Sequence, residues 1–419
     1  MSAHLERLER LGMSRPAFFV PGRIEVLGKH TDYAGGRSLL CAVDRGILMS
    51  VTPRADSMVR VTDAGRGESR EVRLDSDARA TLGDWANYVA TVVRRVARNF
   101  SEARTGADIT FTSDLPVASG LSSSSALVVA IFLALDRVNG LADSPEYRMR
   151  IGSREDLAAY LSSVEMGGDF GSLAGDAGVG TLGGSEDHTA ILCCQANALS
   201  QYSFLPTRHE RTIPFPNDLA FVVAFSGVGA EKTGSALDSY NEASLALRRV
   251  LAIWNTSSGR TDRSIADAVA SDPEAAMHMR LAVDRAKPSD FPAKRLRERL
   301  VQFFHESDTI IPRAAEAFAR GDLGEFSAQV DQSQVLAETM LGNQVPETIA
   351  LVRLAREYGA IAASAFGAGF GGSVWALTEA AGADAFLDEW RRRYAMKFPE
   401  QGRRSEFFVT RPGPGATSL

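Results

Sequence analysis

The spacing of apolar and polar residues along this chain predicts short strands interleaved with longer helices. Apolar residues recur at the spacing of one helix face from Tyr88 to Val96, so residues 85–99 are predicted to form an amphipathic helix. Shorter apolar runs that are bounded by glycine, proline or polar residues are typical of strands. On this basis strands are predicted at residues 18–20, 24–27, 47–52, 109–111, 221–225 and 406–410, with a strand, glycine loop and strand at residues 361–377.

The rest of the pattern predicts further helices and a division into two parts. Helices are predicted at residues 126–138, 235–254, 314–338 (interrupted at Gly321) and 383–394, a polar hairpin at 54–77, and a long glycine-rich loop at 167–184. Strands and helices alternate irregularly, which favours an α+β fold over a regular parallel sheet. We expect an N-terminal domain over residues 1–215, a C-terminal domain over residues 216–410, and a flexible tail over residues 411–419.

Composition narrows the class of protein. The chain has 419 residues, enough for two or three domains or one two-lobed unit. Its 46 Lys and Arg residues against 52 Asp and Glu residues give a net charge of −6, which argues against a nucleic-acid partner. The three cysteines have neither a disulfide framework nor zinc-site spacing. Because the N-terminus lacks an apolar signal segment and the longest apolar run is too short to span a bilayer, we expect a cytoplasmic protein without a membrane partner.

The first candidate motif is a polar turn within residues 21–36, PGRIEVLGKHTDYAGG. Lys29, His30, Thr31, Asp32 and Tyr33 follow a predicted strand, and glycines on both sides allow a sharp turn. A carboxylate accepts hydrogen bonds from hydroxyl groups, whereas an ammonium or imidazole donates them. The cluster therefore predicts recognition of a polyol, and the alternative interpretation is a solvated surface turn.

The second motif is a serine run within residues 115–127, LPVASGLSSSSAL, immediately before an apolar helix. The first amides of a helix have no partner within the helix, and the helix dipole is positive there. Serine hydroxyls beside such a terminus predict a phosphate-binding loop, and a serine oxygen is also a suitable Mg²⁺ ligand. The alternative is a plain serine N-cap, for which one serine would suffice.

The third motif is the glycine loop at residues 367–372, GAGFGG, between two predicted strands. It matches the pattern GxGxxG, but a dinucleotide-binding fingerprint leads into a helix, whereas this loop leads into a strand. We therefore exclude dinucleotide binding. Close approach of the backbone to a ligand or to another loop fits the pattern, and tight packing is the alternative.

In this order and spacing, the three motifs together resemble the GHMP kinase superfamily, and the first resembles the galactokinase signature. Residues 85–89, WANYV, and the pair Tyr240-Asn241 extend the resemblance, which runs from about residue 18 to residue 410. The resemblance implies a two-lobed fold, with an N-terminal lobe like domain 2 of ribosomal protein S5, a ferredoxin-like C-terminal lobe and an active site in the cleft between them. It also implies transfer of the ATP γ-phosphoryl group to a small-molecule hydroxyl, which in galactokinases is the anomeric hydroxyl of the sugar.

The resemblance implies roles for particular residues at the phosphate end of the site. The catalytic base is expected at Asp187, in the segment Gly183-Gly184-Ser185-Glu186-Asp187-His188, with Arg23 beside it; Glu186 and Asp176 are the rival candidates for the base. Mg²⁺ is expected to bind Ser124 and Glu165. The residues expected to wrap the ATP phosphates are Gly120, Leu121, Ser122, Ser123, Ser124 and Ser125.

Sugar recognition is expected to fall to Lys29, His30, Asp32 and Tyr240, with the bare backbone of Gly183 and Gly184 close to the sugar. The chain departs from the galactokinase pattern at Lys29, where the family has glutamate, and at His188, where it has glutamine. A lysine cannot accept a hydrogen bond, but it pairs with a carboxylate.

Three hypotheses therefore stay open. The first is a kinase for galactose or a related neutral hexose. The second is a kinase for an anionic sugar such as galacturonate, whose carboxylate would meet Lys29. The third is a regulator without catalytic activity that binds ATP and a sugar. A monomer or weak homodimer is expected in each case.

Overall fold

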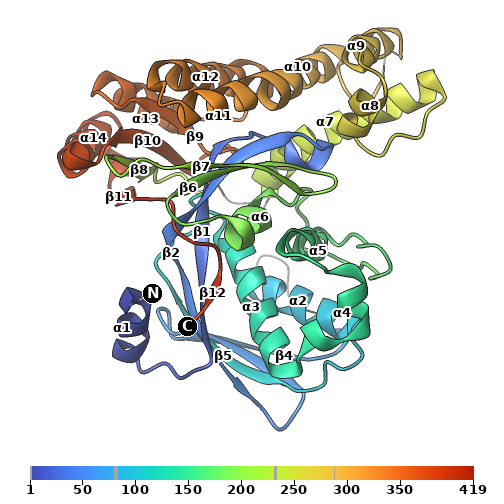
Figure 1. The fold of residues 1–419 in the computed structure, drawn as a ribbon, viewed down its shortest axis with the longest axis vertical. Helices are drawn as coiled ribbons and strands as arrows, with labels where there is room; N and C mark the ends of the chain where they lie inside the picture. The colour runs from blue at the N-terminus through green and yellow to red at the C-terminus, as the bar shows by residue number, and fades with distance from the viewer. Residues whose placement is uncertain (1, 80–83, 231–233, 287) are drawn as a thin grey trace.

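Two β-sheets organise the chain into two lobes, as the computed structural model shows (Figure 1). The structure describes residues 2–79, 84–230, 234–286 and 288–419. A four-stranded sheet lies in the upper half of the view beneath several helices, and an eight-stranded sheet extends from the lower half up to it. The predicted α+β fold with two lobes is confirmed.

The eight-stranded sheet belongs mainly to the first half of the chain. Its order is β12 (Thr417–Ser418), β1 (Ala17–Leu27), β2 (Arg37–Pro53), β5 (Ala107–Ser113), β3 (Met58–Asp63) and β4 (Glu68–Arg73), with β6 (Ala198–Ser203) paired to β2 and β7 (Arg208–Pro214) paired to β6. All of these pairs are antiparallel except β3 with β5. The long strand β2 pairs with β1, β5 and β6, so it connects the parts of this sheet.

The helices of the lower lobe surround the buried α3. The helices of this part are α1 (Ser2–Arg10), α2 (Ala86–Asn99), α3 (Ser123–Asn139), α4 (Pro145–Arg150), α5 (Arg154–Met166) and α6 (Glu186–Cys193), with short turns η1 (Asp32–Ala34) and η2 (Leu141–Asp143). Apolar side chains occupy every position of α3 from Ala126 to Leu135, and all of them except the half-buried Leu133 are buried. Helix α3 therefore packs against the sheet and against α2, α5 and α6 at once.

The four-stranded sheet has the order β11 (Glu406–Thr410), β8 (Leu219–Phe225), β10 (Ser373–Glu379) and β9 (Ala362–Ala365), and all its pairs are antiparallel. Helices of the second half are α7 (Gly234–Ser258), α8 (Ile265–Ser271), α9 (Ala275–Ala286), α10 (Ala293–Phe304), η3 (His305–Ile310), α11 (Ile311–Ala319), α12 (Leu323–Leu336), η4 (Ala337–Leu341), α13 (Pro346–Glu357), η5 (Ala380–Gly382), α14 (Ala383–Lys397) and α15 (Pro399–Gly402). Within the described ranges, no helix has the length and apolar character needed to cross a bilayer.

Most predicted elements are present, but the first strand differs. Strand β1 continues through the Pro21-Gly22 pair, where the sequence predicts a break. The pairing with β2 shifts its register between Pro21 and Arg23, so the proline is accommodated by an irregularity in the ladder. A Cβ atom at Gly22 would lie 2.7 Å from a methyl carbon of Leu115 and 2.9 Å from the carbonyl oxygen of Leu121. The glycine therefore allows the loop before α3 to pack directly on β1.

The last nine residues form a second departure, because the expectation of a flexible tail at residues 411–419 is wrong. Thr417 and Ser418 pair with β1, and the amide of Gly413 donates to the carbonyl oxygen of Ala42. The chain passes from the first sheet to the second between β7 and β8, close to the expected boundary at residue 215. The tail then returns to the first sheet, so a composition typical of loops did not indicate disorder here.

A buried carboxylate in η3 ties the C-terminal half to the turn that follows β1. Glu306 is fully buried, and its Oε1 accepts hydrogen bonds from the amides of Gly28 (3.0 Å) and Lys29 (3.4 Å). The same oxygen accepts a bond of 2.9 Å from Ser333 Oγ on α12, and Lys29 Nζ lies 2.9 Å from that hydroxyl. The lysine, the serine and the glutamate therefore form one buried network that joins the two halves of the chain.

We predict that Glu306→Ala lowers the free energy of unfolding by about 3–5 kcal/mol, because it leaves a buried lysine without a compensating charge and two amides without an acceptor. Chemical denaturation followed by fluorescence measures the change. The matched control is Glu316→Ala, which removes an exposed ion pair with Arg211. This control should lower the free energy of unfolding far less, because exposed ion pairs contribute little to stability. Equal losses in the two variants would contradict the importance of the buried network.

Candidate active site

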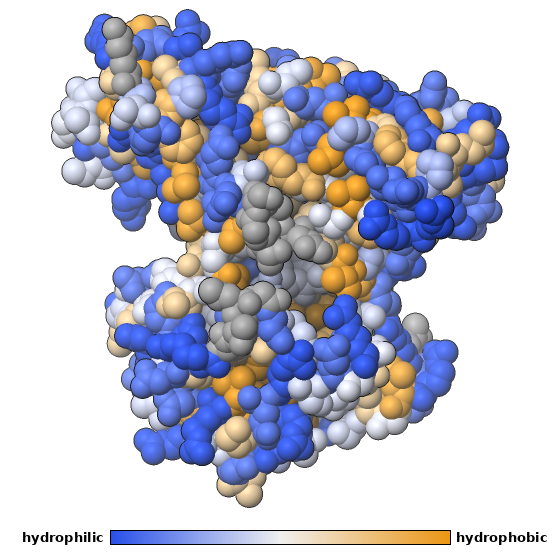
Figure 2. Space-filling model, turned by 180° about the vertical axis from the view of Figure 1, so that it is seen from behind, coloured by the Kyte–Doolittle hydropathy of each residue, from blue (hydrophilic) through white to orange (hydrophobic). Residues whose placement is uncertain are grey.

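A cavity of about 530 Å³ brings the three sequence motifs together. On the face shown in Figure 2, a hollow separates the upper and lower halves of the molecule, with apolar residues along its edges. The residues expected at the site that line the cavity are Arg23, His30, Asp32, Gly120, Ser122, Ser123, Ser124, Ser125, Glu165, Gly183, Gly184, Asp187 and Tyr240. Leu121 and Lys29 are the two expected site residues outside this lining. Leu121 is buried in the core and contributes its backbone instead, by accepting a hydrogen bond from the amide of Arg23.

Lys29, which is expected to contact the substrate, does not line the cavity. Its side chain is fully buried, and Nζ donates to Ser333 Oγ at 2.9 Å and to Ser364 Oγ at 2.8 Å. These hydroxyls lie on α12 and β9, behind the wall of the cavity. The sequence places Lys29 inside a polar turn, but it gives no sign that residues more than 300 positions later enclose its side chain.

The rest of the turn is held in shape by helix α10. His30 has a φ of 56°, a left-handed conformation that is uncommon for a residue with a side chain. The buried Arg299 donates to the carbonyl oxygen of His30 and, at 2.8 Å, to Tyr33 Oη. Gln302 donates to the carbonyl oxygen of Lys29 at 3.1 Å. The turn is thus fixed from behind by two polar side chains that no feature of the sequence singles out.

Asp32 joins the turn to the glycine pair before α6. One of its carboxylate oxygens accepts a hydrogen bond of 3.1 Å from the amide of Glu186, and the other accepts from the amide of Tyr33 at 2.8 Å. Burial raises the pKa of Asp32, and the bond from Glu186 opposes that shift. A Cβ atom at Gly184 would lie 2.4 Å from the Asp32 carboxylate, and one at Gly183 would lie 3.2 Å from Tyr240 Oη. The Gly-Gly pair therefore leaves room for these two polar groups.

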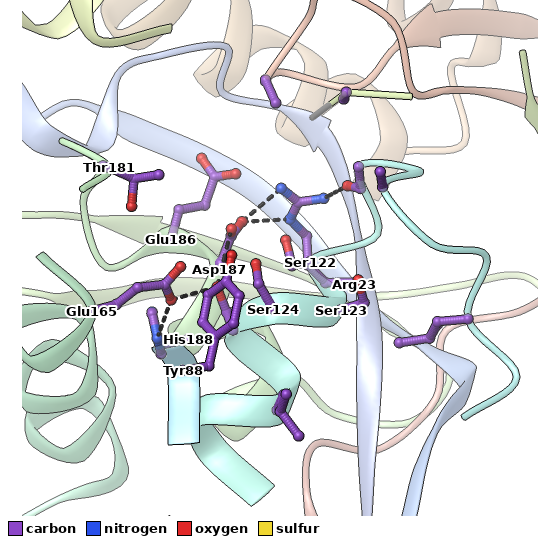
Figure 3. Close-up of a pocket in the computed structure, with 18 of the residues that line it drawn as sticks. Arg23, Tyr88, Ser122, Ser123, Ser124, Glu165, Thr181, Glu186, Asp187 and His188 are labelled. Atoms are coloured by element: carbon purple, nitrogen blue, oxygen red, sulfur yellow. Dashed lines mark hydrogen bonds and ion pairs between the residues drawn. The ribbon is translucent and has the colours of Figure 1, made fainter. Parts of the chain in front are cut away.

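Arg23 and Asp187 form an ion pair at the centre of the cavity (Figure 3). Nη2 of Arg23 lies 2.6 Å from Asp187 Oδ1, and Nε donates to the same oxygen at 2.9 Å. Burial alone would lower the pKa of Arg23, but the charges of Asp187, Glu186 and Glu25 raise it above its ordinary value. Arg23 also donates to the carbonyl oxygen of Gly120. One guanidinium therefore contacts both the candidate base and the serine loop.

The two rival candidates for the base have other partners. Asp176 lies outside the cavity lining and pairs with Arg94 at 2.8 Å. Glu186 lines the cavity, but its Oε2 accepts a bond of 2.5 Å from Ser38 Oγ. Among these three carboxyl groups, Asp187 is the one that makes a direct ion pair with Arg23.

Helix α3 begins inside the serine run, at Ser123, three residues earlier than the apolar pattern predicts. The capping residue Ser122 has a φ of 59°, and its side chain makes no capping hydrogen bond. The side chains of all four serines line the cavity, so the plain N-cap interpretation is not supported. Ser125, rather than Ser124, is hydrogen-bonded to Glu165, with Oγ 2.9 Å from Oε2.

Glu165 Oε2 has a second neighbour, because His188 Nε2 lies 3.1 Å from it. The hydroxyl of Ser125 is also 3.5 Å from Asp187 Oδ2, so it lies within hydrogen-bond distance of two carboxylates. The site therefore gathers hard oxygen atoms next to the N-terminus of α3, and the ring of His188 lies beside Glu165.

An aromatic and apolar part of the cavity lining was not recognised from the sequence. Trp85, Tyr88 and Phe111 line it, and Trp85 meets Phe111 edge to face with ring centroids 6.0 Å apart. Leu115, Val117 and Leu127 extend this surface. The helical spacing of residues 85–99 correctly predicted α2, but a core-facing stripe and a cavity wall have the same apolar pattern.

The glycine loop GAGFGG meets both a cavity and other loops. Gly367 and Ala368 line the cavity, and the amide of Gly372 donates to the carbonyl oxygen of Val228 at 2.8 Å. A Cβ atom at Gly371 would lie 2.7 Å from that carbonyl oxygen. The close approach of backbone that the sequence predicts is therefore confirmed.

Comparison with known proteins identifies the same segments. A family model described as the galactokinase galactose-binding signature matches residues 9–53, and the models of the GHMP kinases N terminal domain and GHMP kinases C terminal match residues 87–171 and 314–395. These matches contain the polar turn, the serine loop and the glycine loop, in that order.

Curated relatives named galactokinase match along most of the chain. Those of Chloroflexus aggregans and Chloroflexus aurantiacus are each 28% identical to it over 406 residues, which cover 95% of this chain and 92% of the relative. The galactokinase of Actinobacillus pleuropneumoniae serotype 5b is 41% identical over 113 residues, or 27% of this chain and 29% of the relative.

Solved structures share the fold. The galactokinase of Lactococcus lactis, complexed with galactose, matches with a TM-score of 0.78 and 23% identity, over 100% of this chain and 99% of that one. A mevalonate kinase matches with a TM-score of 0.55 and 14% identity, over 94% and 98% of the two chains. From the motifs, the cavity that joins them and these matches, we conclude that the chain belongs to the GHMP kinase superfamily and is a galactokinase-like sugar kinase.

Proposed function

We propose that this kinase transfers the γ-phosphoryl group of ATP to the anomeric hydroxyl of galactose or a closely related neutral hexose. The observation that carries the proposal is the Arg23–Asp187 ion pair, which lies between the serine loop and the polar turn. The galactokinase signature over residues 9–53 and the relatives named galactokinase support galactose as the acceptor.

The nucleotide fits the half of the cavity between the aromatic wall and α3. The amides and hydroxyls at the N-terminus of α3 are suited to the phosphates, because they combine hydrogen-bond donors with the positive end of the helix dipole. The apolar surface of Trp85, Phe111 and Leu127 is suited to the flat base. This assignment places the γ-phosphate near Arg23, whose second contact is to the serine loop.

The sugar fits the half of the cavity that the polar turn forms. Asp32, His30 and Tyr240 present one carboxylate, one imidazole and one phenol to a polyol. Asp187 is the proposed acceptor for the proton of the attacking hydroxyl, and Arg23 stabilises its ionised form. Arg23 then also stabilises the negative charge on the phosphoryl group during transfer.

Mg²⁺ fits the oxygen-rich corner beside α3. Glu165 and Asp187 place carboxylate oxygens within 3.5 Å of the Ser125 hydroxyl, and Mg²⁺ prefers hard oxygen ligands such as these. Glu165 with a serine hydroxyl, from Ser124 or Ser125, would hold the ion. When bound, the ion would neutralise charge on the ATP phosphates.

The galacturonate alternative loses its main support in this arrangement. Lys29 is enclosed by Ser333 and Ser364, so its ammonium has no path to a substrate carboxylate. The cavity wall presents two further acids instead, Glu25 and Glu186. The regulator alternative is not favoured either, because the Arg23–Asp187 pair and Glu165 are all retained in the cavity.

We predict that Asp187→Asn lowers kcat by roughly 10²- to 10⁴-fold, because the amide cannot accept the proton. A coupled assay of ADP release with galactose measures the effect, and a thermal shift with ATP checks that the variant still binds nucleotide. Asp143→Asn removes an exposed carboxylate that pairs with Arg148, and it should stay within about twofold of the wild type. Turnover like that of the wild type in Asp187→Asn would overturn the assignment of the base.

The same assay over a panel of sugars tests the acceptor. We expect kcat/KM for galactose to exceed that for galacturonate by at least about 100-fold, because a substrate carboxylate would face Glu25 and Glu186. Lys29→Met should leave this ratio within about threefold of the wild-type value. A preference for galacturonate that disappears in Lys29→Met would refute the neutral-sugar proposal.

The acid pair also predicts a dependence of stability on pH. Burial raises the pKa of Glu186 well above its ordinary value of 4.5, and the charge of Glu25 is the second largest cause of the shift. Above pH 4.5 the unfolded chain releases a proton that the native protein keeps, so the free energy of unfolding falls as the pH rises. Gln does not ionise, so Glu186→Gln should be more stable than the wild type at pH 8.

Thermal denaturation between pH 4.5 and pH 8 measures the difference in stability between Glu186→Gln and the wild type. This difference should shrink toward pH 4.5. Glu357→Gln makes the same exchange at an exposed position and serves as the control. A difference for Glu186→Gln that is constant from acidic to alkaline pH would show that the native carboxyl has no raised pKa.

A further inference from the structure

Glu25 is a buried acid in the cavity wall to which neither the motifs nor the matches assign a role. It lies on β1 two residues after Arg23, and successive side chains of a strand point to opposite faces. Arg23 and Glu25 accordingly both line the cavity, whereas Ile24 and Val26 are buried in the apolar core. The side chain of Glu25 is only 3% exposed, which is a costly position for a carboxyl group without a function.

The hydrogen bonds of this carboxyl group are incomplete. Its Oε1 is buried and accepts no hydrogen bond from a donor in the described part of the chain. The carboxyl group of Glu186 lies beside it, and Arg23 and Lys29 act on it from either side through their charges. A Cβ atom at Gly367 would lie 1.9 Å from Glu25 Oε2, so the backbone of the glycine loop closes one side of the group. Glu25 is thus fixed in position with one oxygen still able to accept a bond.

Glu25 and Glu186 act as a pair. Burial raises the pKa of Glu25, although Arg23 and Lys29 oppose the shift, and burial together with Glu25 raises the pKa of Glu186. Both carboxyl groups line the cavity, and Glu25 keeps one buried oxygen without a hydrogen-bond donor among the described residues. An acceptor oxygen in that position is suited to the hydroxyl group of a sugar.

We propose that Glu25 is a specificity-determining residue that accepts a hydrogen bond from a sugar hydroxyl other than the one phosphorylated. The inference rests on the proposed function, because it takes the ligand of this half of the cavity to be a sugar. The anomeric hydroxyl is assigned to Asp187, which pairs with Arg23. Glu25 then accepts a hydrogen bond from a second hydroxyl of the same ring. A sugar without that hydroxyl would leave the buried carboxylate oxygen without a donor.

A purely structural role for Glu25, such as balancing the charge of Lys29, makes a different prediction. In that case its removal would distort the cavity and would slow all sugars by a similar factor. A direct contact instead changes the discrimination between sugars that differ by one hydroxyl.

The test compares galactose with its 2-, 3-, 4- and 6-deoxy analogues in the wild type, Glu25→Ala and Glu25→Gln. For the wild type, one analogue should lose roughly 10- to 100-fold in kcat/KM because of the missing bond to Glu25. In Glu25→Ala, kcat/KM for galactose should fall by a similar factor. The value for that one analogue should fall little further, because its bond to Glu25 is already missing. Glu25→Gln keeps a carbonyl acceptor and should recover part of the loss. The exposed Glu316→Gln is the control and should keep the wild-type pattern.

Equal factors of loss for galactose and every analogue in Glu25→Ala would overturn the proposal while leaving the kinase function intact. If the wild type turns over no sugar, the proposed function fails separately, and sugar-dependent thermal shifts over the same panel then decide the role of Glu25. The contact is supported if Glu25→Ala reduces the thermal shift with galactose but leaves the shift with one deoxy analogue unchanged. The absence of any shift, or shifts that fall equally for all sugars, overturns it.

Discussion

The buried guanidinium of Arg23 is the interaction on which the site depends. It pairs with Asp187 on α6, donates to the carbonyl oxygen of Gly120, and its amide donates to Leu121. Strand β1, helix α6 and the loop before α3 are thus fixed to one another by one residue. Since a buried cation without a partner is costly, the energy of this contact also constrains the three elements to a single arrangement.

The second constraint lies one layer behind the cavity. The turn after β1 holds His30 in a left-handed conformation, and Arg299, Gln302 and Glu306 bind its backbone from α10 and η3. The groups that face the sugar half of the cavity are therefore positioned by a helix of the other half of the chain. Glu25 and Lys29 illustrate the division: the first faces the cavity, whereas the second belongs to the network behind it.

Local patterns in the sequence were sufficient for most of the fold and for the pieces of the site. Periodicity located α2, the α11–α12 break at Gly321 and the strands around the glycine loop, because each depends on neighbouring residues. The motifs predicted that Arg23, Asp32 and Asp187 belong to one site, and all three line the cavity. The position of Lys29 could not be predicted, because Ser333 and Ser364 enclose it from more than 300 residues away. The role of Arg299 was missed for the same reason, as nothing near it in the chain marks it as a contact of the turn.

The return of the tail to β1 has a consequence for the order in which the molecule is assembled. The four-stranded sheet and its helices are inserted between β7 and β12 of the eight-stranded sheet. During synthesis the edge of β1 at Phe18 and Phe19 therefore stays open while about 400 further residues are made, until Thr417 and Ser418 arrive to cover it. An open edge is a template for pairing with another chain, and the pairing of β12 with β1 removes this template in the folded protein.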